Sequence, residues 1–197
     1  MLKAERTRLY ILQTVAPIFN KNGYAAMSLS KITAATGLTK GAIYGHFKNK
    51  EELALESFRF SVRLVLKDLN AFVNSGKTPL QRLLNVAAFY KTYYEYSKKF
   101  GGCPILNIGV DSNNQETSIV ELVRTYNRRM LEQFEKLIDL CKASKELKSS
   151  VNSELFAKRF FYMIEGAVYM SYVMKDDYYL IDVSNNIKDI INNELKK

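Results

Sequence analysis

Residues 28–47, which read SLSKITAATGLTKGAIYGHF, constrain the fold of this chain more than any other stretch. Ser28 can cap a first short helix, and Thr39 can cap a second. Gly37 lies between the two segments and permits a positive φ in a tight turn. Two short helices joined by a glycine-containing turn predict a helix-turn-helix.

The second helix of this motif is expected to have a buried face and a face suited to a DNA groove. Ile43 and Phe47 are four residues apart and predict the buried face. On the other face, Lys40 can donate to guanine, and small side chains permit close approach to thymine methyl groups. Aromatic rings with polar tips, and side-chain hydroxyls, can form hydrogen bonds to phosphate oxygens. For Ser28, both a phosphate contact and a role as a helix cap are possible. The residues expected to contact DNA are Ser28, Thr39, Lys40, Gly41, Ala42, Tyr44, His46 and Lys50.

The charge distribution agrees with binding to a polyanion. The chain has a formal net charge of +9, and residues 1–50 contain eight basic residues and one acidic residue. A basic N-terminal quarter on a nearly neutral remainder is typical of nucleic-acid binders. Charge for solubility alone would explain the total but not this concentration.

The motif resembles the DNA-binding domain of TetR-family transcriptional regulators. The resemblance covers about residues 6–55 and is carried by Gly23-Tyr24, Ile32, GLTKGAIYGHF at 37–47 and NKEEL at 49–53. The family usually has alanine at the positions of Thr33 and Thr36, and a larger residue at that of Gly45. The resemblance implies a helical body with a ligand pocket.

The apolar periodicity predicts an all-α protein of nine helices and no strands. The expected helices cover about residues 3–21, 28–35, 39–47, 49–73, 79–98, 103–110, 118–143, 152–175 and 183–195. We expect a DNA-binding domain over residues 1–50 and a ligand-binding and dimerisation domain over residues 51–197. GCPILN at 102–107 and EGA at 165–167 also resemble one branch of the TetR family.

Aromatic residues in the body are candidates for a ligand pocket. Tyrosines at helical spacing are core residues by default, but each buried hydroxyl needs a partner. Glu165 lies in the apolar run 160–174, where it either pairs with a buried polar group or selects a cationic or hydrogen-bonding ligand. The candidate pocket residues are Phe58, Phe89, Tyr93, Asn107, Tyr126, Tyr162, Glu165 and Tyr169.

The sequence contains no recognisable catalytic or cofactor motif. It has one histidine, and Cys103 and Cys141 stand far apart, so we expect no metal site, no cofactor and no enzymatic activity. No signal peptide is visible, and the most apolar run is shorter than the roughly 20 residues needed to span a bilayer. We therefore expect a cytoplasmic protein that does not enter membranes.

These observations predict a homodimeric, ligand-responsive transcriptional regulator, with repression more expected than activation. It would bind a palindromic double-stranded DNA operator and be released by a small-molecule effector of unknown identity. The expected dimer interface is the terminal apolar stripe formed by Val183, Ile187, Ile191 and Leu195. The alternatives are a non-specific nucleic-acid-binding protein, or a helical small-molecule binder without a regulatory role.

Overall fold

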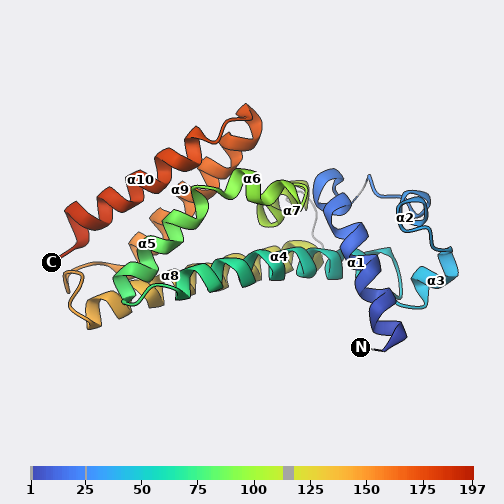
Figure 1. Ribbon diagram of the computed structural model, residues 1–197, viewed down its shortest axis with the longest axis horizontal. Helices are drawn as coiled ribbons and strands as arrows, with labels where there is room; N and C mark the ends of the chain where they lie inside the picture. The colour runs from blue at the N-terminus through green and yellow to red at the C-terminus, as the bar shows by residue number, and fades with distance from the viewer. Residues whose placement is uncertain (1, 25, 113–117) are drawn as a thin grey trace. The chain divides into compact units, whose positions relative to one another are not determined.

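The computed structural model describes residues 2–24, 26–112 and 118–197. Figure 1 shows a succession of helices from the N-terminus to the C-terminus. They are α1 (Lys3–Asn22), α2 (Leu29–Thr36), α3 (Lys40–Tyr44), α4 (Lys50–Asn74), α5 (Pro79–Tyr90), α6 (Tyr93–Lys98), α7 (Pro104–Ser112), α8 (Ser118–Ala143), α9 (Ser153–Met174), α10 (Tyr178–Ile190) and the π-helix η1 (Ile191–Leu195).

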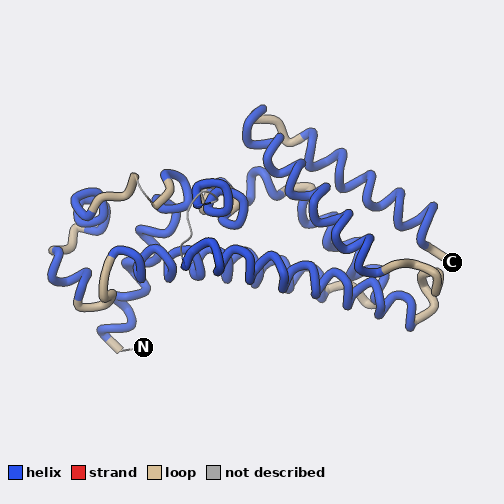
Figure 2. The backbone as a smooth tube through the Cα atoms, turned by 180° about the vertical axis from the view of Figure 1, so that it is seen from behind, coloured by secondary structure: helices blue, strands red, loops and turns tan. Residues whose placement is uncertain are grey.

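The prediction of an all-α fold is confirmed, because the described residues form helices, turns and loops without a strand (Figure 2). These described residues contain ten α-helices and not the nine expected. The long fifth helix of the prediction is divided, because the Lys91 N–H donates to the Ala88 carbonyl at 3.2 Å and closes α5 with a tight final turn. The last helix starts five residues earlier than expected, where the Asp176 carboxylate accepts from the Tyr178 N–H at 2.9 Å.

The chain forms two compact units, each made of two segments. The first contains Met1–Val65 and Lys98–Arg124, and the second contains Leu66–Ser97 and Thr125–Lys197. Helices α4 and α8 therefore contribute residues to both units. The expected domain boundary at residue 50 is not a boundary between these units, and it remains a prediction about function.

The first unit is built on a core shared by α1, α2, α3 and the beginning of α4. Four side chains that are fully buried there are Ile11, Val15, Ile32 and Ile43. The first two lie four residues apart on α1, so one stripe of that helix faces α2 and α3. Leu12, Phe19 and Phe47 also belong to this core.

The second unit places α9 and α10 as an antiparallel pair, with α10 also packed against α5 (Figure 1). Asn152 caps α9 by accepting from the Leu155 N–H at 3.0 Å. Thr78 caps α5 in the same way, with Pro79 in its first turn as predicted. The inward face of α9 buries Phe160, Ile164 and Val168.

Candidate nucleic-acid interface and ligand cavity

Local hydrogen bonds fix the turn between α2 and α3. Ser28 accepts from the Lys31 N–H at 3.3 Å and caps α2. Gly37 has φ of 67° and ends α2 in the left-handed region, where a side chain would be strained. Thr39 then caps α3 by accepting from the Ala42 N–H at 3.2 Å. The helix-turn-helix predicted from these residues is confirmed.

Burial of one face of α3 determines which residues it presents outward. Ile43 and Phe47 are buried, and the Phe47 N–H donates to the Ile43 carbonyl at 3.2 Å. The helix stops at Tyr44, with Gly45 as its C-cap. Because α3 has only five residues, its position depends on this anchored face and on its cap.

The opposite face of α3 is open to solvent. Thr39, Lys40, Gly41 and Ala42 are all exposed, as is Ser28 at the start of α2. A Cβ built on Gly41 would meet no other atom within 4 Å, so the backbone is accessible there. The N-terminal turn of α3 therefore presents a cation, two small methyl-bearing side chains and bare backbone to solvent, which suits contact with base edges.

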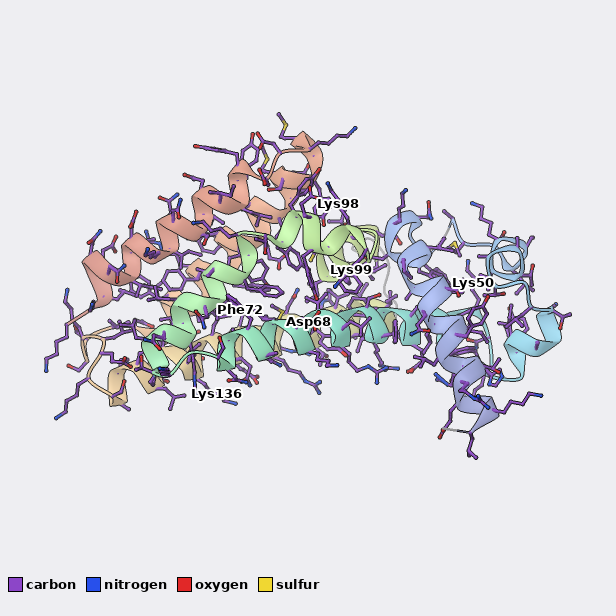
Figure 3. The ribbon with its side chains drawn as sticks, in the orientation of Figure 1. Lys50, Asp68, Phe72, Lys98, Lys99 and Lys136 are labelled. Carbon is purple, nitrogen blue, oxygen red and sulfur yellow. The ribbon has the colours of Figure 1, made fainter. Side chains whose placement is uncertain are left out.

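Tyr44, His46 and Lys50 are half-buried at the border of this face. The Lys40 ammonium lies 6.0 Å from the centre of the Tyr44 ring, so these two side chains share a side of α3. The Lys50 ammonium lies 4.2 Å from the centre of the Tyr24 ring (Figure 3). The structure thus brings all eight predicted DNA-contacting residues onto α2, α3, the loop after α3 and the start of α4.

Two side chains that sequence reasoning missed hold this motif in place. The Tyr10 hydroxyl donates to the Thr36 carbonyl at 2.9 Å, at the end of α2. The Arg8 guanidinium lies 4.5 Å from the centre of the Phe47 ring and 3.4 Å from the Glu56 carboxylate. Arg59 and Arg8 hold the pKa of Glu56 below its usual value, against the opposing effect of its burial. The basic character of Arg8 was visible in the sequence, but its structural contact was not.

The GCPILN segment forms a connection to α1 inside the first unit. The Asn20 amide donates to the carbonyls of Phe100 and Gly102 at 2.7 and 2.8 Å. The Asn107 amide donates to the carbonyls of Asn20 and Gly101, each at 3.1 Å. Asn107 was predicted to line a ligand pocket, and these contacts give it a structural role in joining α7 to the end of α1.

The second unit contains a cavity of about 490 Å³. This volume is within the range of about 300–1,000 Å³ that is common for sites of small molecules. Its walls come from the C-terminal half of α4, from α5 and from α8. The lining is mainly apolar and also contains two asparagines, a glutamine and three basic residues.

Only Tyr126 of the eight predicted pocket residues lines this cavity. Phe58 and Asn107 belong to the first unit. Tyr93 is buried, and its ring centre lies 5.9 Å from that of Phe89 in an aromatic cluster. The remaining three candidates lie on α9, outside the cavity lining: Tyr162, Glu165 and Tyr169. The cavity therefore shares one residue with the predicted pocket, because tyrosine content does not reveal which helical face a ring occupies.

Glu165 is half-buried on α9, with no hydrogen bond or ion pair in the part of the chain that the structure describes. Its carboxyl group lies among closely packed protein atoms. The resulting loss of solvation raises the pKa of Glu165 to about 7. The buried polar partner that the sequence suggested for it does not exist within the described residues.

The four predicted dimer residues are buried within a single chain. Val183, Ile187, Ile191 and Leu195 are between 0 and 7% exposed, because this stripe packs against its own chain. The exposed apolar side chains of this region lie on the other side of α9 and beyond its end. Tyr162 and Tyr169 are 63 and 51% exposed, and Leu155 and Val173 are 57 and 56% exposed.

Nothing in the described residues indicates metal or membrane chemistry. No group of three or more His, Cys, Asp or Glu side chains in residues 2–24, 26–112 and 118–197 is arranged to hold a metal ion. No helix within those ranges is sufficiently long and apolar to cross a bilayer. Within the described residues both cysteines are buried and neither forms a disulfide, and burial raises the pKa of Cys141 to about 12, which favours its protonated thiol.

Comparison with known families accounts for both parts of the chain. Residues 11–56 match the family model described as bacterial regulatory proteins, tetR family. Residues 79–186 match the model described as tetracyclin repressor-like, C-terminal domain. The chain belongs to the TetR family of DNA-binding transcriptional regulators, which are not enzymes.

Two individual relatives match over most of their length, and a third matches over a short part. A TetR transcriptional regulator from Chloroflexus aurantiacus has a solved structure that superimposes with a TM-score of 0.94 at 28% identity, covering 100% of this chain and 99% of that one. The uncharacterised regulator YxaF of Bacillus subtilis is 25% identical over 195 residues, which are 94% of this chain and 95% of YxaF. The regulator AcrR of Shigella flexneri is 41% identical over 59 residues, and this match covers only 30% of this chain and 27% of AcrR.

Proposed function

We propose that this protein is a homodimeric repressor that binds a palindromic operator in the cytoplasm and is released by a small molecule. The observation that carries the proposal is the exposed face of α3, whose opposite face is anchored by the buried Ile43 and Phe47. A short helix held in this way can enter a major groove with its N-terminal residues at the base edges.

The side chains on this face divide into two kinds of contact. Lys40 is the candidate for donating to guanine, and the methyl groups of Thr39 and Ala42 are candidates for contacting thymine. The Tyr44 hydroxyl, the His46 imidazole, the Lys50 ammonium and the exposed backbone of Gly41 are candidates for phosphate contacts. Ser28 already caps α2, and its hydroxyl proton can still donate to a phosphate.

We further propose that two copies of the chain associate through the outer face of α9. Leu155, Tyr162, Gly166, Tyr169 and Val173 are exposed and follow one another at steps of 7, 4, 3 and 4, so they form one stripe along that helix. No atom lies within 4 Å of a Cβ built on Gly166, so a second helix has room to approach there. A large apolar stripe of this kind on a helix commonly marks an interface.

Release by a small molecule is supported by the elements that line the cavity. Leu66, Leu69 and Val73 of α4 lie on its wall, while Leu53 and Ala54 near the start of the same helix belong to the core of the first unit. A ligand that binds more tightly to one position of α4 would shift the equilibrium between a DNA-binding and a released form.

The proposed function is tested by measuring binding to the DNA upstream of the protein's own gene and to a random duplex of equal length, at one fixed salt concentration. Affinity at least about a thousandfold higher for one upstream segment would support a sequence-specific regulator. Equal affinity would instead indicate the non-specific nucleic-acid-binding alternative.

The proposed dimer is tested by analytical ultracentrifugation of Tyr162→Asp. This substitution places a charge in the apolar stripe and should yield monomers, because a buried unpaired charge is costly. Asn185→Asp, at an exposed position of α10, is the matched control and should remain dimeric. If Tyr162→Asp also remains dimeric, the interface lies elsewhere.

A further inference from the structure

The cavity in the second unit is lined by positively charged side chains as well as apolar ones. Its lining includes Arg82, Arg129 and Lys136, and no acidic residue is among its fifteen lining residues. Apolar side chains form most of the remaining wall, for example Leu69 and Met130. The site therefore combines apolar surface with positive charge.

Two rows of side chains on α8 produce this combination. Arg129, Gln133 and Lys136 follow one another at steps of 4 and 3, and form a polar row along the helix. Met130 and Leu137 are seven residues apart and form an adjacent apolar row. A ligand lying along α8 would therefore meet apolar groups on one side and cations on the other.

The two cations of this row form no ion pair within the described part of the chain. Arg129 and Lys136 are both exposed. The Arg82 Nε–H donates to the Gly76 carbonyl at 3.1 Å, a bond that leaves its positive charge uncompensated. Asp68 on α4 is outside the cavity lining, and its carboxylate accepts from the Tyr96 hydroxyl at 2.7 Å.

We propose that the effector of this protein is an amphipathic anion, with an apolar body and one acidic group. This inference rests on the proposed function, because it names the class of ligand that the cavity would take. The apolar body contacts Leu69, Met130 and Leu137, and the acidic group is attracted to Arg129 and Lys136. A cationic ligand would instead place like charges together in a partly desolvated site. Glu165 does not line the cavity and so does not select a cation there.

Isothermal titration calorimetry with two probes of equal chain length tests the proposed charge preference. The probes are decanoate and decyltrimethylammonium, each used below its micelle-forming concentration. Decanoate should bind the full-length protein, and the ammonium compound should bind at least about tenfold more weakly, since two nearby cations attract one and repel the other. No binding of decanoate, or equal binding of the two, would overturn the proposal.

The double variant Arg129→Gln/Lys136→Gln assigns the effect to the cavity. It should weaken decanoate binding by about tenfold and leave the far-ultraviolet circular dichroism unchanged, because both side chains are exposed. Lys67→Gln is the matched control, since Lys67 is exposed on α4 and does not line the cavity. A control that weakens binding equally, or a double variant that binds decanoate normally, would contradict the proposal.

Measuring operator binding by the same proteins distinguishes a wrong ligand class from a wrong proposed function. If the wild-type protein distinguishes operator from random DNA but prefers the cationic probe, the ligand class is wrong and the proposed function stands. If the wild-type protein does not distinguish the two duplexes, the proposed function fails, whichever probe it binds.

Discussion

Replacing Glu165 with glutamine should stabilise the protein at pH 8 by more than at pH 4. Loss of solvation raises the pKa of Glu165 from 4.5 to about 7, and the described residues offer no positive charge to oppose the shift. The folded state therefore holds this proton more tightly than the unfolded state does. As pH rises from 4.5 to 7, the unfolded chain loses the proton first, and stability falls. Above pH 7, the carboxylate is charged in both states.

The size of this effect follows from the pKa difference. Each unit of pKa shift corresponds to about 1.4 kcal/mol, so the full shift amounts to about 3 kcal/mol. Glu165 is only half-buried as a residue, and water can screen part of its charge. We therefore expect about half the full value, or about 1–2 kcal/mol. Glutamine has the same shape and cannot ionise, so it removes this pH-dependent loss.

Urea denaturation at pH 4 and pH 8 measures the effect, with both proteins at the same concentration. The free energy of unfolding of Glu165→Gln relative to wild type should rise by about 1–2 kcal/mol between the two pH values. Glu132→Gln is the control, because Glu132 is exposed on α8. If Glu165→Gln is instead less stable than wild type at pH 8, the carboxylate has a stabilising partner in the assembled protein, and the reasoning is refuted.

Three further substitutions test separate parts of the account. Thr39→Ala should lower stability by about 1 kcal/mol, whereas Thr39→Ser keeps the capping hydroxyl and should preserve stability; equal stability of the two variants would show that the cap is unimportant. Lys50→Ala should reduce the slope of log affinity against log salt by about 1 on operator and random DNA alike, and an unchanged slope would place Lys50 away from phosphate. Gly102 has φ of 113°, and a Cβ there would lie 2.6 Å from the Asn107 amide nitrogen. Gly102→Ala should therefore lower the melting temperature, while Gly109→Ala, whose Cβ would make an ordinary 3.5 Å contact, should not; equal effects would argue against strain at Gly102.

Local sequence rules predicted the helix-turn-helix correctly. The caps at Ser28 and Thr39, the turn at Gly37 and the buried Ile43 each depend on residues a few positions apart. Such short-range constraints can be read directly from the order of residues. The exposed face of α3 then follows, because burial of one side of a helix fixes the other.

The cavity and the proposed dimer surface could not be found by the same reasoning. The stripe containing Ile187 was correctly identified as apolar, but the sequence does not say whether such a stripe meets its own chain or another. The cavity depends on the packing of α4, α5 and α8, which are distant in sequence. Arg129 and Lys136 resembled ordinary surface charge until their position beside Met130 was known.

The central claim is that α3 reads the base sequence of DNA through Lys40, and one binding measurement tests it most directly. Fluorescence anisotropy at fixed salt would compare wild type and Lys40→Ala on the operator and on a random duplex, with Lys21→Ala on α1 as the control. The account predicts that Lys40→Ala loses about 1–3 kcal/mol on the operator and much less on random DNA. An equal loss on both duplexes, or no loss on the operator, would contradict the claim that Lys40 reads a base.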